Sequence, residues 1–175
     1  TDAILISLMA MGISQGDEVI CPAFACAPCA QAISHLGATP VFVDVRPETY
    51  CLDPDLTLSA LTSRTKAIVA AHLFGQACEI DRLSTIARTY SVGVVEDMRH
   101  AVGGRIGGRR LGSYGTTSTF SFYPTRPLGA VGDGGLIATS DEKCAETVRK
   151  LREHGCSKGN IHDMIGLNSR LDAIQ

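Results

Sequence analysis

Residues 80–97, IDRLSTIARTYSVGVVED, join an amphipathic helical pattern to a short apolar stretch that ends in two acids. Apolar side chains recur at helical spacing over 80–90, and the run 92–95 reads as a buried strand. Helix–strand units of this kind are typical of a parallel sheet that is covered on both faces. The sequence therefore predicts an α/β fold, with Glu96 and Asp97 at the carboxyl end of one strand.

The same alternation extends along the chain in both directions. A nearly all-apolar helix over 4–11 comes first, and a helix that is apolar on every side must be buried. A charged helix over 141–153 closes the pattern. The predicted fold is a three-layer sandwich around a mostly parallel, mixed sheet. Between the two end helices we expect strands at 19–21, 41–45, 67–71, 92–95, 118–122 and 136–139, and helices at 27–36, 53–61 and 80–90.

Composition and charge exclude several classes of protein. A chain of 175 residues, 45% of them hydrophobic, suits one domain with a sizeable core. The net charge of −2 provides no basic surface for nucleic acid, and no apolar run is long enough to cross a bilayer. We therefore expect a cytoplasmic protein with neither nucleic acid nor membrane as a partner. The chain starts at Thr1 and stops in a helical-looking pattern at 171–175, so we also expect a fragment.

Two motifs are weaker than they look. Cys26 and Cys29 form a CxxC, but no second pair follows at zinc-site spacing, and their neighbours are small residues. We interpret these cysteines as packing residues rather than as a metal or redox site, and the sequence predicts no metal. The run GGRIGG at 103–108 only mimics a dinucleotide fingerprint, because it neither follows a buried strand directly nor opens a helical pattern.

Candidate functional residues lie where strands end, because ligands of open α/β sheets bind beyond the carboxyl ends. Asp97 is either a cap for the next segment or a ligand-binding carboxylate, and His100 either shares that pocket or is a hydrogen-bonded structural residue. The stretch 120–135 combines hydroxyls, a cation and glycines, which suits a phosphate as well as a tight turn. Thr1 and Asp2 begin the first helix, where an N-cap or an anion is favoured.

Nine short segments in register resemble the DegT/StrS-type sugar aminotransferases. These are fold-type I, aspartate-aminotransferase-like enzymes that use pyridoxal phosphate (PLP) to make amino sugars from nucleotide-linked keto sugars. The resemblance implies that residues 1–175 are a single large, cofactor-binding domain, truncated at both ends and without the C-terminal small domain. The segments are 1–3, 16–20, 37–45, 72–76, 95–97, 120–124, 128–129, 132–135 and 166–172.

The resemblance implies a role for each matching residue. Asp97 would pair with the protonated pyridine nitrogen, which keeps the cofactor ring an electron sink. Ser121 and the helix start at Thr1 and Asp2 would hold the cofactor phosphate. Asn168 would reach the phosphate of the partner subunit's cofactor, which implies a homodimer with shared sites.

Three positions depart from the family pattern. Arg126 stands where the Schiff-base lysine is expected, and a guanidinium stays protonated and cannot form that bond. His100 stands where many relatives have glutamine, and Cys26 stands where an aromatic ring stacks on the cofactor. We therefore expect Arg126 and His100 at the reaction centre, ordinary transamination to be lost or crippled, and any PLP to be bound non-covalently.

Three functions stay open at this point. The first is an aminotransferase-family protein of amino-sugar or polysaccharide biosynthesis, which takes a nucleotide-sugar substrate and an amino donor and is impaired by Arg126. The second is a catalytically degenerate domain that keeps the fold for binding or assembly. The third is a sugar dehydratase that uses pyridoxamine phosphate (PMP), which would need a proton-transfer base near the cofactor.

Overall fold

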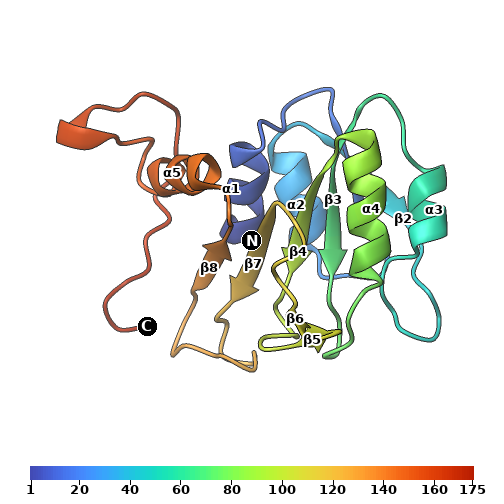
Figure 1. Cartoon of the computed structure of the whole chain (residues 1–175). Coiled ribbons are helices and arrows are strands. Elements are labelled where there is room, and N and C mark those ends of the chain that lie inside the picture. Colours follow the sequence, from blue (N-terminus) through green and yellow to red (C-terminus); the bar gives the residue numbers. More distant parts are fainter.

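The computed structural model describes residues 1–175, and a six-stranded sheet runs through its centre (Figure 1). The strand order is β2-β1-β3-β4-β7-β8. The first five of these strands are parallel to one another, and β8 is antiparallel to β7. The sheet confirms the predicted α/β class and its mostly parallel, mixed character. Its strands are β1 (Glu18–Pro22), β2 (Thr39–Val43), β3 (Thr65–Ala71), β4 (Gly93–Asp97), β7 (Thr117–Ser121) and β8 (Gly135–Ala138).

Helices cover both faces of the sheet and complete three layers (Figure 1). Helices α1 and α2 pack on one face, and α4 packs on the other with α3 beside it. Helix α5 lies against α1. The helices are α1 (Asp2–Ala10), α2 (Pro28–His35), α3 (Pro54–Ser59), α4 (Ile80–Tyr90) and α5 (Glu142–Leu151), with a 3₁₀ turn, η1 (Lys158–Asn160).

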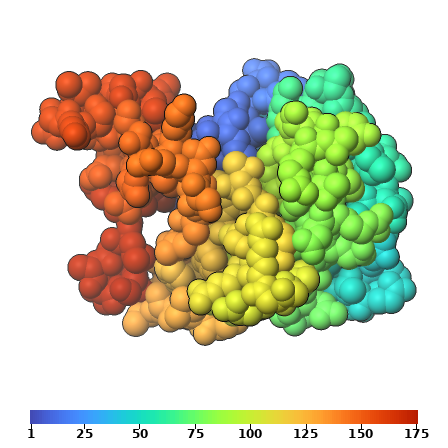
Figure 2. Space-filling model, in the orientation of Figure 1, coloured from blue at the N-terminus to red at the C-terminus, as the bar shows by residue number.

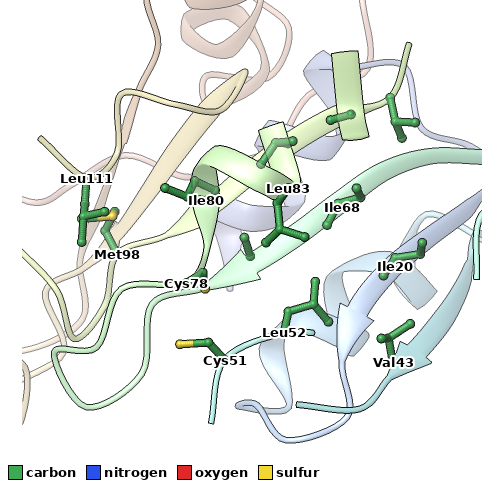
Figure 3. Packing of buried hydrophobic residues seen from close by; sticks show 14 of the residues in the cluster. Ile20, Val43, Cys51, Leu52, Ile68, Cys78, Ile80, Leu83, Met98 and Leu111 are labelled. Carbon is green, nitrogen blue, oxygen red and sulfur yellow. The ribbon is translucent and has the colours of Figure 1, made fainter. Parts of the chain in front are cut away.

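Each face of the sheet has its own hydrophobic core. Consecutive side chains of a strand point to opposite faces, so neighbouring residues of β3 enter different clusters. Ile68 packs with Ile80 and Leu83 under α4 (Figure 3). Val69 packs on the other face with Leu8 of α1. Packing in the two cores sets the position of each strand along its own axis. It therefore also sets where the polar residues at the strand ends lie.

The all-apolar helix α1 is buried, as its sequence predicts. Ile4, Ile6 and Leu8 are each no more than 3% exposed. Helix α1 packs against α2, α5, β7 and β8, so protein surrounds most of its circumference. None of the helices combines the length and the apolar character that crossing a bilayer requires.

The glycine-rich stretch forms a small antiparallel hairpin that the sequence did not predict. Strand β5 (Arg105–Ile106) pairs with β6 (Arg109–Arg110). The two linking residues, Gly107 and Gly108, have φ of 52° and 83°, the left-handed conformation that such a two-residue hairpin loop needs. Strands of two residues are too short to show a period of two, which explains why the pattern was missed.

The end of the chain differs from its helical expectation. Residues 171–175 form a turn, because the Asp172 carboxylate accepts the backbone N–H of Ile174 at 2.9 Å and so competes with helical hydrogen bonding. The side-chain oxygen of Gln175 accepts the backbone N–H of Gly132 at 2.6 Å, which brings the chain end back to the β7–β8 loop. In Figure 2 the residues after α5, in orange and red, form a lobe at the side of the main body.

Candidate active site

Three of the predicted site residues, Asp97, Ser121 and Cys26, lie at one edge of the sheet. Strands β1, β3, β4 and β7 are parallel, so their carboxyl ends meet there. Asp97 ends β4, Ser121 ends β7, and Cys26 follows β1 at the approach to α2. Asp97 lies opposite Thr119 in the register of β4 with β7, so Ser121 stands two residues further along the same edge.

Asp97 is buried, and its carboxylate is already engaged within the chain. Oδ1 accepts the backbone N–H of Arg99 at 3.2 Å. Oδ2 forms an ion pair with Nη2 of Arg99 and lies 3.8 Å from Sγ of Cys29. Like Val95 two residues before it, Asp97 points to the sheet face that α1 and α2 cover. The carboxylate that we expected to face a cofactor therefore faces an arginine.

Arg99 lies in the candidate site, although no sequence pattern predicted a role for it. Its side chain is 7% exposed, and Nη2 also lies 3.5 Å from Sγ of Cys29. Burial acts to lower the pKa of Arg99, but the hydrogen bond and charge of Asp97 outweigh it, so the net shift is upward. Burial also raises the pKa of the Cys29 thiol to about 12, with the Asp97 charge adding to the effect. A cation two residues after a strand-end carboxylate was the signal in the sequence.

Glu96, the neighbour of Asp97, has a different environment on the opposite face. Its carboxylate accepts three backbone N–H groups of the loop before β7, from Gly112 (2.8 Å), Tyr114 (2.7 Å) and Gly115 (2.6 Å). His72 Nε2 lies 3.2 Å from the same carboxylate. Burial would raise the pKa of Glu96, but the hydrogen bonds from His72 and the backbone lower it overall. Glu96 therefore anchors the loop before β7.

The two residues predicted at the reaction centre are in contact. Nη1 of Arg126 lies 2.7 Å from Nε2 of His100. Burial lowers the pKa of His100, and the charges of Arg126 and Arg99 lower it further, so the neutral ring accepts the guanidinium N–H. Phe74, after β3, stacks on the imidazole with ring centroids 6.1 Å apart. His100 Nδ1 and Arg126 Nε are buried and have no hydrogen-bond partner within the chain.

The expected phosphate-binding residues lie around the start of α1. Helix α1 packs on β7 and β8, and Ser121 at the end of β7 pairs with Gly135. Thr1 is the N-cap of α1 but makes no side-chain capping bond. The Asp2 carboxylate accepts the hydroxyl of Ser169 at 2.6 Å.

The C-terminal segment reaches the same helix start through this bond. Asn168, next to Ser169, is exposed and forms a β-bridge with Glu153. Its proposed contact with a partner subunit stays a prediction.

A comparison with known proteins places this geometry in context. The family model described as "DegT/DnrJ/EryC1/StrS aminotransferase family" matches residues 1–175. The chain is 44% identical over its full length to a pleiotropic regulatory protein of Geobacillus stearothermophilus. It is 43% identical over its full length to UDP-2-acetamido-2-deoxy-3-oxo-D-glucuronate aminotransferase of Pseudomonas aeruginosa. It covers 47% and 49% of these two proteins, so the chain spans about half the length of the curated relatives it matches.

A solved structure has the same fold as this chain. The structure of DesV from S. venezuelae in complex with a ketimine intermediate superposes with a TM-score of 0.95 and 41% sequence identity. The match covers 99% of this chain and 47% of that one. The fold-type I assignment made from the sequence is confirmed by this similarity.

Proposed function

Because the chain belongs to the DegT/DnrJ/EryC1/StrS aminotransferase family, we propose that it is the cofactor-domain part of a protein acting on nucleotide-linked keto sugars, in which lysine-dependent transamination is disabled. The named activity of the Pseudomonas aeruginosa relative supports this substrate class. The proposal includes an amino donor as co-substrate, a homodimer in which Asn168 reaches the partner's site, and a cytoplasmic location.

The observation that carries the proposal is the position of Arg126. Its guanidinium lies on His100 at the carboxyl edge of the sheet, where the resemblance places the Schiff-base lysine. A lysine can lose its proton in a dry pocket and attack a carbonyl, but a guanidinium stays protonated. Arg126 can instead donate hydrogen bonds to His100 and to an anionic ligand, which makes it a binding group.

The residues present fit only half of the PLP molecule. The free N–H groups at the start of α1 and the Ser121 hydroxyl suit a phosphate. The ring half does not fit, because the Asp97 carboxylate is paired with Arg99, position 126 has no amine, and Cys26 has no aromatic face. The residues present therefore support no reaction step through PLP or PMP.

The mismatched ring half favours a second candidate, a degenerate domain with a binding or assembly role. The regulatory name of the Geobacillus stearothermophilus relative is compatible with that role. The two candidates differ in one property: a disabled enzyme recovers covalent PLP capture when the amine is restored, whereas a domain that has lost the pocket does not.

Borohydride trapping of PLP tests the proposal. We expect the native chain to carry no adduct at position 126 after incubation with saturating PLP and reduction, and Arg126→Lys to carry one, as located by peptide mass spectrometry. Arg105→Lys in the exposed hairpin introduces a lysine outside the site and serves as the matched control. Trapping at position 105 but not at position 126 would contradict the placement of the reaction centre.

A further inference from the structure

Arg99 is the only arginine or lysine of the chain that is buried. A buried charge is costly unless an opposite charge and hydrogen bonds compensate it. Arg99 meets that requirement through Asp97, because Nη2 pairs with Oδ2 while the backbone N–H of the same residue binds Oδ1. Both carboxylate oxygens are therefore engaged by one residue.

No other group near Arg99 can replace Asp97 as the counter-ion. The Cys29 sulfur lies 3.5 Å from Nη2, but burial raises the pKa of this thiol to about 12, so it remains a neutral S–H at physiological pH. His100 is a neutral ring whose Nε2 faces Arg126. Glu96 points to the opposite face of the sheet and is held by backbone N–H groups. Asp97 is therefore the single anion available to Arg99.

We propose that Arg99 is a built-in competitor for the cofactor ring, an internal cation that occupies the Asp97 carboxylate where a pyridinium would otherwise bind. This inference rests on the proposed function, because it takes Asp97 as the ring-binding carboxylate of the site. One carboxylate 3% exposed cannot serve two cations from the same side, so ring binding requires Arg99 to leave. If the Arg99 side chain moves away, its guanidinium loses its counter-ion. The cost of breaking this ion pair therefore weakens PLP binding.

The charge preference of this site follows from the same pair. With Arg99 in place, the ring half of the site excludes a protonated pyridine and repels other cations. The free N–H groups at the start of α1 and the Arg126 guanidinium remain complementary to anions. The native chain should therefore bind a phosphate-bearing sugar ligand better than it binds the PLP ring.

Equilibrium PLP binding to Arg99 variants of the full chain tests the inference. We expect Arg99→Ala to bind PLP about tenfold more tightly than the native chain, the ratio typical of one regained charge-assisted hydrogen bond. We expect Arg99→Lys, which keeps a cation opposite Asp97, to gain little. Adding Asp97→Asn to Arg99→Ala should abolish the gain. With ring-¹⁵N-labelled PLP, the Arg99→Ala complex should show a protonated ring nitrogen.

The outcomes separate this inference from the proposed function. If Arg126→Lys alone captures PLP as tightly as Arg126→Lys/Arg99→Ala, Arg99 does not compete and only the inference fails. If none of these variants binds PLP, the proposed cofactor site fails, and the inference fails with it. Circular dichroism checks that Arg99→Ala folds, and Arg99→Gln gives the same comparison if it does not, because glutamine keeps a donor for Asp97 without the charge.

Discussion

Glu96 and Asp97 are consecutive residues of β4, both buried, yet the chain neutralises them in two different ways. Glu96 is held by three backbone N–H groups of the loop before β7 and by His72. Asp97, on the other face, is held by the side chain and the backbone N–H of Arg99, and its Oδ2 lies 3.8 Å from the Cys29 thiol. The loop before β7 must unfold before Glu96 loses its backbone donors, whereas Asp97 loses its ion pair when the Arg99 side chain changes rotamer. We therefore call Glu96 the structural acid and Asp97 the site acid.

The largest effect should come from removing the structural acid. Glu96→Ala leaves three backbone donors and His72 without an acceptor, each worth about 1–3 kcal/mol when buried, so we expect a loss of about 5 kcal/mol in the free energy of unfolding. Urea denaturation measures the loss, with Glu48→Ala on the exposed surface as the control. A cost of less than 1 kcal/mol would show that the loop before β7 does not depend on Glu96.

Acid should reproduce part of this effect in the native chain. The pKa of Glu96 is lowered below its ordinary value of 4.5, so folding favours the charged form. Its stabilisation is therefore fully present above pH 4.5 and is lost as the pH falls through the lowered value, at up to about 1.4 kcal/mol per pH unit. The difference in free energy of unfolding between the native chain and Glu96→Ala should therefore decrease as the pH falls over that range.

The site acid should behave differently in a double-mutant cycle. Asp97→Ala strands the Arg99 charge, and Arg99→Met strands the Asp97 charge, so each change alone should cost about 3 kcal/mol in the free energy of unfolding. The double variant removes both charges and keeps the apolar stem at position 99, so it should cost only about 1 kcal/mol. Additive costs in urea denaturation would mean that the two side chains do not act as a pair.

The sequence predicted the position of these acids but not their partners. Period and apolar runs located β4 and its end at Asp97, because burial on both faces leaves a continuous apolar strand. The partner of Asp97 depends on which rotamer Arg99 adopts after the strand, and no periodic pattern encodes a rotamer. The family resemblance directed attention to Arg126, His100 and Cys26, three departures from an expected residue. Arg99 matched no motif and was therefore overlooked.

The same limit applies to the segments that the sequence placed wrongly. The turn at 171–175 depends on the Asp172 side chain taking a backbone N–H, a local competition that apolar spacing does not report. The β5–β6 hairpin depends on two positive φ angles at Gly107 and Gly108. Long elements with buried faces were predictable because many side chains repeat one signal, whereas a turn depends on one or two bonds.

The smallest expected effect is on the pKa of His100. It tests whether Arg126 adds to the positive electrostatic potential around Arg99. Burial lowers the pKa of His100 first, and the charges of Arg126 and Arg99 lower it further. Arg126→Ala removes one charge and opens the ring to water, so we expect the His100 pKa to rise towards its ordinary value of 6.5, as measured by NMR titration. Arg126→Lys keeps the charge and should move the His100 pKa less, and Arg105→Ala in the hairpin should leave that pKa unchanged.

Because folding favours neutral His100, the native chain loses stability as the pH falls below 6.5, and Arg126→Ala should weaken that pH dependence. An unchanged His100 pKa in Arg126→Ala would mean that Arg126 does not contribute to the field of the site, and would leave Arg99 as its only effective cation.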